Sequence, residues 1–145
     1  MHPNLSRAVL AGFVGTLGMT AMMYVVAPMM GLHMDIAAML GSILGGNWGA
    51  GMAMHFVNGS LVFPAVYVYA LYGLLPGSPV TKGATMGIAL WLLAQVIVMP
   101  MMGGGLFSSA LGGMMAAVAS LVGHLVYGSL FGALAGAPES RVAHA

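Results

Sequence analysis

The chain has 145 residues, of which 61% are hydrophobic and only 3% are charged, and it contains no cysteine. Soluble domains carry about a quarter charged residues, so this chain cannot cover a water-facing surface of its size and is expected to lie in a membrane. The lack of cysteine excludes disulfides, thiolate metal sites and thiol nucleophiles. The net charge of +1, with no basic run, gives no sign of a nucleic-acid partner.

Four segments are apolar enough and long enough to cross a bilayer, which takes about 20 residues per helix. They must be α-helical, because lipid offers no partner to unpaired backbone groups and no segment alternates like a barrel strand. The sequence therefore predicts an all-α, polytopic membrane protein that forms a single membrane domain over residues 1–145. The four predicted transmembrane helices are Ala8–Met30, Gly49–Leu74, Gly83–Met102 and Ala116–Gly136.

The few charges predict an orientation. With four spans, both termini and the loop between the second and third spans lie on the same side of the membrane. Arg7, Lys82 and Arg141 all fall on that side, whereas Asp35 is the only charge on the other. Because an excess of Lys and Arg marks cytoplasmic loops, we expect a bacterial inner-membrane protein with both termini in the cytoplasm.

Three motifs occur in the same order in both halves of the chain, at offsets of 72, 71 and 69 residues. This pattern predicts two tandem helical hairpins, approximately residues 1–74 and 75–145. Each hairpin has two spans, so both enter the membrane in the same direction, as parallel repeats related by an axis along the membrane normal. The paired motifs are "PMMG" at 28–31 and 100–103, "IAAMLGS" at 36–42 with "FSSALGG" at 107–113, and "HFVNGSL" at 55–61 with "HLVYGSL" at 124–130.

Two outer segments, Gly31–Asn47 and Gly103–Met115, are too short to span the membrane. They are glycine-rich and weakly amphipathic, which is typical of interfacial or re-entrant helices. Asp35 is expected to cap the first of these helices by accepting hydrogen bonds from the amides that follow it.

The repeat places His55 and His124 at the same depth near the outer ends of the second and fourth spans. Gly59 and Gly128 lie on the same helical faces, four residues further on. One interpretation is structural: each histidine bonds to a neighbouring helix and each glycine lets the backbones approach. In that case Asn58 and Gln95 are expected to join the histidines in one polar layer.

A second interpretation is a b-type haem held between the two imidazoles, with the glycines admitting the edge of the macrocycle. Haem is commonly ligated by histidine, and bundle cores are where such cofactors lie. No Arg or Lys lies near that depth to pair with the propionates, which counts against this interpretation.

A third interpretation is Cu(I), because most of the 16 methionines fall in the outer half and thioether with imidazole suits this ion. The alternative explanation is packing, since methionine is a flexible filler of irregular space. The candidate ligands in the sequence are Met30, His33, Met34, Met52, Met54, Met101 and Met102.

The sequence gives little support for catalysis, because its two acids, Asp35 and Glu139, lie on opposite sides of the membrane. Helix breaks at equivalent places in two halves also occur in transporters, but this bundle would have to dimerise to form a pathway. A seam of small residues in the first span favours contact with the second span or with another protein. Its members are Ala8, Gly12, Thr16 and Thr20.

The leading expectation is therefore a non-catalytic accessory or structural subunit of a larger membrane complex, with a respiratory complex as one candidate. Its expected partners are lipid and other membrane subunits or a second copy. The four short spans, the proline-glycine break and "GHLVYGSLFG" at 123–132 resemble an uncharacterised family of small bacterial inner-membrane proteins. That resemblance implies the same fold and location, and it brings no activity or functional residue.

Overall fold

The computed structural model describes residues 3–136, and every regular element in that range is helical. Short π-helical segments continue several of the α-helices, and a 3-10 turn covers Leu106–Ser108. The α-helices are α1 (Leu5–Ala21), α2 (Ala27–Met29), α3 (Ile36–Ser42), α4 (Trp48–Val57), α5 (Phe63–Val66), α6 (Pro79–Leu93), α7 (Met99–Met101) and α8 (Gly113–Ala135). The π-helical segments are Met22–Val26, Asn58–Val62, Tyr67–Leu71 and Ala94–Val98.

Within the described residues, four continuous helices are long and apolar enough to span a membrane, which confirms the predicted all-α, four-span fold. They are Leu5–Met29, Trp48–Leu71 (called helix two below), Pro79–Met101 and Gly113–Ala135. The third span begins four residues before the predicted Gly83 because Ser78 caps it, its side chain accepting from the Thr81 amide, and Pro79 takes the first helical position. Arg141 and Glu139 lie outside the described residues.

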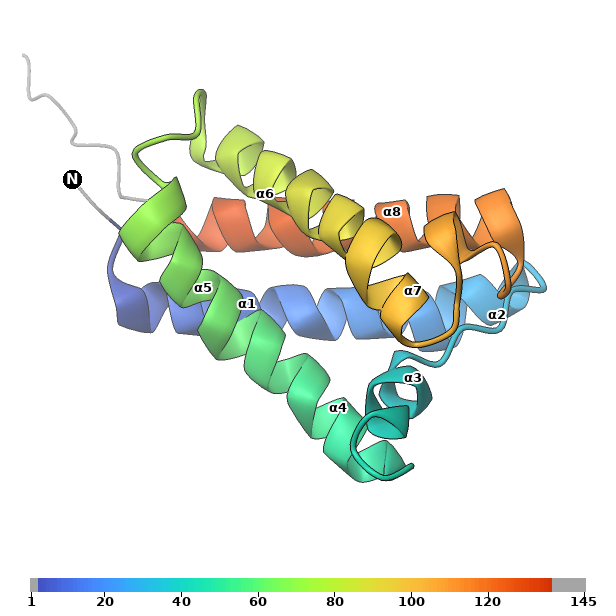
Figure 1. Ribbon diagram of the computed structural model, residues 1–145. Coiled ribbons are helices and arrows are strands. Elements are labelled where there is room, and N and C mark those ends of the chain that lie inside the picture. The colour runs from blue at the N-terminus through green and yellow to red at the C-terminus, as the bar shows by residue number, and fades with distance from the viewer. Residues whose placement is uncertain (1–2, 137–145) are drawn as a thin grey trace, which may run out of the picture.

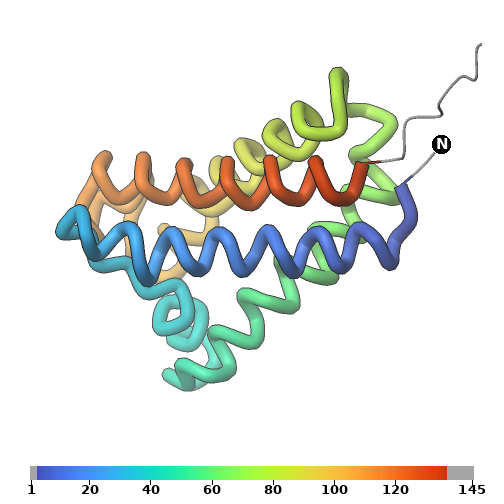
Figure 2. Tube along the Cα trace, turned by 180° about the vertical axis from the view of Figure 1, so that it is seen from behind, coloured from blue at the N-terminus to red at the C-terminus, as the bar shows by residue number. Residues whose placement is uncertain are grey.

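Neighbouring spans run antiparallel, and both ends of the described chain lie at the same end of the bundle (Figures 1 and 2). We call this the inner end, and the opposite end, which carries α3, the outer end. α8 packs along both α6 and α1. Helix two contacts α1 mainly through its π-helical segment Asn58–Val62 and α5, and α4 diverges from α1 towards the outer end, where α3 packs against it (Figure 1).

Four glycines bring α6 and α8 into backbone contact. A Cβ atom at Gly83 would lie 2.1 Å from the carbonyl oxygen of Gly128, and one at Gly128 would lie 2.3 Å from the carbonyl oxygen of Gly83. Gly87 and Gly132 are equally close to the backbone of the opposite helix. In lipid, where apolar side chains gain nothing by meeting each other, such small-residue contacts hold helices together.

The small-residue seam of α1 faces helix two and is used within the chain. A Cβ atom at Gly12 would lie 2.4 Å from the carbonyl oxygen of Gly59, and one at Gly59 would lie 2.1 Å from Oγ1 of Thr16. Ala8 and Thr16 are 0% and 1% exposed. Of the two partners considered from the sequence, the seam therefore contacts helix two.

The two outer segments differ. The first forms α3, and Asp35 caps it as predicted, with Oδ1 accepting a hydrogen bond of 2.9 Å from the Ala38 amide. The second contains only the 3-10 turn, so the expected helix is not formed there. It has no capping side chain, and glycines with positive φ, +72° at Gly105 and +109° at Gly112, interrupt it before α8 begins.

The two "PMMG" breaks have the same backbone geometry. Met30 has φ −95° and ψ 8°, and Met102 has φ −93° and ψ 9°. The glycines that follow, Gly31 and Gly103, have φ +76° and +78°. Each break also follows a π-helical segment, but the second helices of the two halves differ, since helix two contains π-helical turns and α8 does not. The duplication stays a prediction that this local match favours.

Candidate functional site

A cavity of about 290 Å³ lies in the outer half of the bundle, between α1, helix two, the third span and α8. It is partly open and is lined mainly by aliphatic and thioether side chains. It exists because α4 diverges from α1 and because helix two makes no extensive contact with α6 or α7. Residues 32–40, which include part of α3, contribute to its outer wall, and we call them the outer cover.

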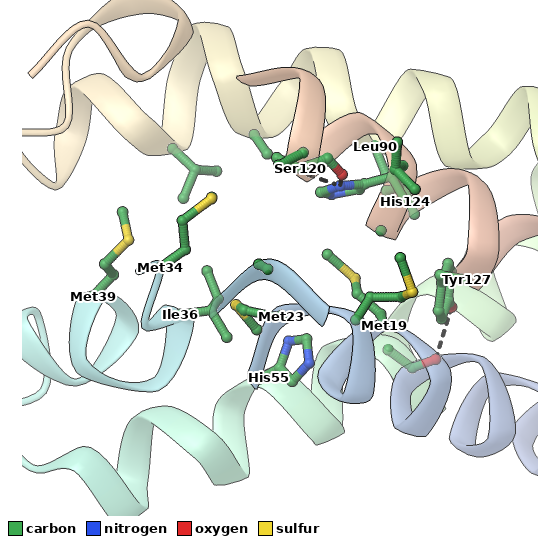
Figure 3. A pocket seen from close by; sticks show the side chains of 18 of the residues that line it. Met19, Met23, Met34, Ile36, Met39, His55, Leu90, Ser120, His124 and Tyr127 are labelled. Carbon is green, nitrogen blue, oxygen red and sulfur yellow. Dashed lines mark hydrogen bonds between the residues drawn. The ribbon is translucent and has the colours of Figure 1, made fainter. Parts of the chain in front are cut away.

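Eight methionines of the described residues line this cavity. Figure 3 shows Met19, Met23, Met34 and Met39 around it. Thioether side chains are flexible and polarizable, so this wall is adaptable. The lining methionines are Met19, Met22, Met23, Met30, Met34, Met39, Met99 and Met115.

The structure brings together only part of the predicted copper set. Met30 and Met34 line the cavity. His33 is exposed on the chain segment before α3, and Met101 is 74% exposed. Neither of these two residues lines the cavity, and neither do Met52, Met54 and Met102.

His124 lines the cavity from α8 (Figure 3). Its Nδ1 lies 2.8 Å from the carbonyl oxygen of Ser120, one turn earlier in the same helix. A carbonyl oxygen can only accept, so Nδ1 carries the proton and donates it. In the neutral ring, Nε2 therefore keeps its lone pair.

His55 lines the same cavity from α4 and is 9% exposed. Its Nε2 lies 3.1 Å from Oγ1 of Thr20 on α1. The single hydroxyl proton of Thr20 goes to the carbonyl oxygen of Thr16, at 2.7 Å, so the imidazole must donate to the hydroxyl. Nδ1 of His55 keeps its lone pair and has no hydrogen-bond partner among residues 3–136.

Both histidines line one cavity, and each has one ring nitrogen with a free lone pair. The two rings are held in place by different groups. His55 is held by a side chain of another helix and His124 by the backbone of its own helix. They also stand at different places in their helices, because α8 begins at Gly113, earlier than predicted, and α4 begins at Trp48. Both histidines line the same cavity, but strict equivalence of the two positions is not observed, and their pairing stays a prediction.

The two motif glycines serve helix packing. Gly59 lines the cavity and also contacts Thr16, whereas Gly128 lies against Gly83 and Gly87 of α6 and does not line the cavity. Gly128 therefore leaves no space for the edge of a macrocycle.

The predicted polar layer is divided. Asn58 lines the cavity, but Gln95 is fully buried outside the set of lining residues, where its Oε1 accepts from Oγ of Ser108 at 2.8 Å. Tyr127, which sequence reasoning missed, lines the cavity and donates to the carbonyl oxygen of Gly59. The available signal was its position in the motif, because Tyr127 stands where the first copy has Asn58.

A b-type haem does not fit these surroundings. The cavity lies at the small end of ligand pockets, which run from about 300 to 1,000 Å³. No Arg or Lys of the described residues lines it; Arg7 and Lys82 lie at the inner end, where they donate to the carbonyl oxygens of Leu134 and Tyr72. The propionates would therefore have no cationic partner from the described residues.

Asp35 joins three elements at the outer end. Its Oδ1 accepts from the hydroxyl of Tyr24 at 2.5 Å, and its Oδ2 accepts from Nε1 of Trp48 at 3.0 Å. Burial acts to raise the pKa of Asp35, but the hydrogen bonds from Tyr24, the Ala38 amide and Trp48 outweigh it and lower the pKa below the ordinary value. The ionised carboxylate therefore ties the outer cover to the first span and to the start of helix two.

These features define a four-span helical membrane protein with a methionine-lined cavity that holds two histidines. Residues 3–145 match the model of the Family of unknown function (DUF6789), and the chain belongs to this family. The predicted membership in an uncharacterised family is thereby confirmed. No curated protein and no solved structure matches the chain.

Proposed function

We propose that the protein holds a small ligand in the outer cavity, with His55 and His124 as its polar contacts. One observation carries this proposal: two imidazoles, each with one ring nitrogen that has no hydrogen-bond partner among residues 3–136, line an otherwise largely apolar cavity. Apolar pockets with a few convergent polar groups are typical ligand sites. Ionisable side chains inside membrane spans also favour a functional role, because they are costly to keep there.

The donor set supports binding over catalysis. The lining residues supply imidazole, thioether, a single side-chain amide and the hydroxyls of Thr16, Ser120 and Tyr127, and no carboxylate that would serve as a general acid or base. Asp35 belongs to the outer cover, and its carboxylate is occupied by Tyr24, Trp48 and the Ala38 amide. We therefore propose a non-catalytic protein.

Native mass spectrometry of the detergent-solubilised protein, taken directly from its membranes, tests this proposal. A stoichiometric bound molecule or ion is expected in the wild type and is expected to be lost in Gly123→Leu, which fills the cavity. A Cβ atom at Gly123 would lie 3.5 Å from Met19, an ordinary contact, so the helix accepts a side chain there. Gly73→Leu is the matched control, because nothing lies within 4 Å of a Cβ at Gly73. An empty wild-type protein in gentle extracts would contradict the proposal.

The accessory-subunit role is the second candidate, and the open flank between helix two and α6 favours it. The seam of α1 is already occupied within the chain, so this flank is the place for a helix of another subunit. Co-purification of a stable larger assembly after gentle solubilisation would support that role, and a homodimer would favour the transporter alternative. A monomer that retains its ligand would argue against both.

For the orientation, we propose that both termini face the cytoplasm of a bacterial inner membrane. The support is that α1 and α6, which carry Arg7 and Lys82 in their first turns, begin at the same end of the bundle, whereas α3, which Asp35 caps, lies at the other end (Figure 1). The chain has no cysteine, so a single introduced cysteine is the only site that a maleimide can label. An impermeant maleimide is expected to label Ser42→Cys in intact spheroplasts and to spare Leu74→Cys. The reverse pattern would overturn the orientation.

A further inference from the structure

We infer that the ligand of the cavity is Cu(I), a soft monovalent metal ion. This inference rests on the proposed function and names the chemical class that the site selects. It is carried by the proton positions on the two histidines, the softness of the other donors and the absence of charge on the cavity wall.

The hydrogen bonds of the two histidines suit the binding of a Lewis acid, because each ring keeps one nitrogen lone pair free. A metal takes the lone pair of a neutral imidazole, and the other ring nitrogen of a ligating histidine usually donates to a fixed acceptor that orients the ring. His124 meets this condition through Ser120 and His55 meets it through Thr20. A ligand that accepts hydrogen bonds would meet two acceptors instead, so the site selects a cation or a hydrogen-bond donor.

The remaining donors select among cations. The lining residues provide eight thioethers and neither a carboxylate nor a thiolate. Ca²⁺ and Mg²⁺ require oxygen ligands, and structural zinc sites use four ligands drawn from cysteine, histidine and carboxylate. Imidazole with thioether sulfur suits Cu(I).

The uncharged wall of the cavity also favours a monovalent cation. Among residues 3–136 no charged side chain lines the cavity, so a bound cation is not neutralised there by an anion from the described part of the chain. Burying an uncompensated charge is costly, and the cost rises with the square of the charge. A monovalent ion is therefore held at much lower cost than Zn²⁺ or Cu²⁺. Asp35, at the outer cover, is the one acidic group at this end of the described chain and attracts cations towards the cavity.

The methionines do not behave as simple filler. Filler side chains would close the space, yet eight flexible methionines leave a cavity of about 290 Å³ beside two free imidazole lone pairs. Figure 3 shows Met19, Met23 and Met34 around the same space as the two rings. Methionine side chains are flexible, so their sulfur atoms can turn towards an ion bound in this space.

The test is a titration of the purified, full-length, metal-free protein with Cu(I) under anaerobic conditions, in competition with a chromophoric Cu(I) chelator. One equivalent is expected to bind, and Zn²⁺ is expected not to compete. His55→Ala and His124→Ala are each expected to weaken Cu(I) binding at least tenfold. Met23→Leu, a conservative change that keeps the packing volume, separates ligation from folding and is expected to weaken binding as well.

Matched controls come from predicted ligands that lie away from the cavity. His33→Ala and Met101→Leu change an exposed imidazole and an exposed thioether, and both are expected to leave Cu(I) binding unchanged. Binding that survives His55→Ala and His124→Ala, or no binding at all, overturns the inference. If native mass spectrometry then shows an organic molecule in the cavity, the proposed function still stands; if the cavity is empty, both fail.

Discussion

The hydroxyl of Tyr127 on α8 donates a hydrogen bond of 2.8 Å to the carbonyl oxygen of Gly59 in helix two, 68 residues away. Each residue belongs to one copy of the histidine motif, so this bond joins the two copies directly. Tyr127 is 3% exposed and lines the cavity. The bond therefore holds helix two at the place where α4 begins to diverge and the cavity opens.

Tyr127→Phe removes this bond and leaves a carbonyl oxygen without its partner in an apolar interior. We expect the free energy of unfolding to fall by about 1 kcal/mol, the usual size of a hydrogen bond between membrane helices. Equilibrium unfolding in mixed SDS micelles measures the change. Tyr69→Phe, at a residue that is 75% exposed, is the control and is expected to have no effect. Equal losses in both variants would show that the bond contributes nothing specific.

The glycine contact between α6 and α8 predicts a larger effect. A methyl group at Gly128 would lie 2.3 Å from the carbonyl oxygen of Gly83, so Gly128→Ala must push the helices apart. We expect a loss of about 2 kcal/mol or more, within the range of overpacked cores. Gly123→Ala, on the same helix, meets only an ordinary contact of 3.5 Å and is expected to be tolerated. Similar stability of the two variants would contradict the backbone contact.

Gln95 and Ser108 predict a non-additive pair of mutations. The Oγ of Ser108 donates to Oε1 of Gln95 at 2.8 Å, and both residues are 0% exposed. Gln95→Met or Ser108→Ala alone leaves the oxygen of the other side chain without its partner in a buried site, at a cost of about 1–3 kcal/mol, whereas the double variant removes both partners and is expected to lose less than the sum of the two single losses. A double-mutant cycle in SDS unfolding measures the coupling. Strictly additive losses would mean that the two side chains act independently.

Local signals were enough to predict the helices. Hydropathy and length located all four spans, and the Asp35 cap followed from its position before α3. The second outer segment was harder, because its resemblance to the first is in apolar pattern and not in a capping residue. Glycines with positive φ and the lack of an acidic cap decide its structure, so the same pattern gives a helix in one half and a turn in the other.

The cavity could be predicted only in part. The repeat located both histidines, and both line it. Its shape depends on the crossing of α1 and helix two at Gly12 and Gly59, beyond which α4 diverges. That divergence results from how the helices pack, and the pattern of apolar residues in the sequence does not predict it. It also decides which methionines reach the cavity, and for this reason Met19 and Met23 line it while Met52 and Met54 do not.

Asp35 predicts an acid-dependent loosening of the outer cover. Its pKa in the folded protein is lower than the ordinary value of 3.8, so its ionised form stabilises the folded arrangement. That contribution is complete above the ordinary pKa and is lost as the pH falls through the lower, folded-state pKa. In a Trp91→Phe background, the fluorescence of Trp48 is expected to stay constant from neutral pH to about pH 4 and to change below it. Asp35→Asn is expected to remove this transition, and a midpoint above the ordinary pKa, or an unchanged transition in Asp35→Asn, would show that another group holds the cover.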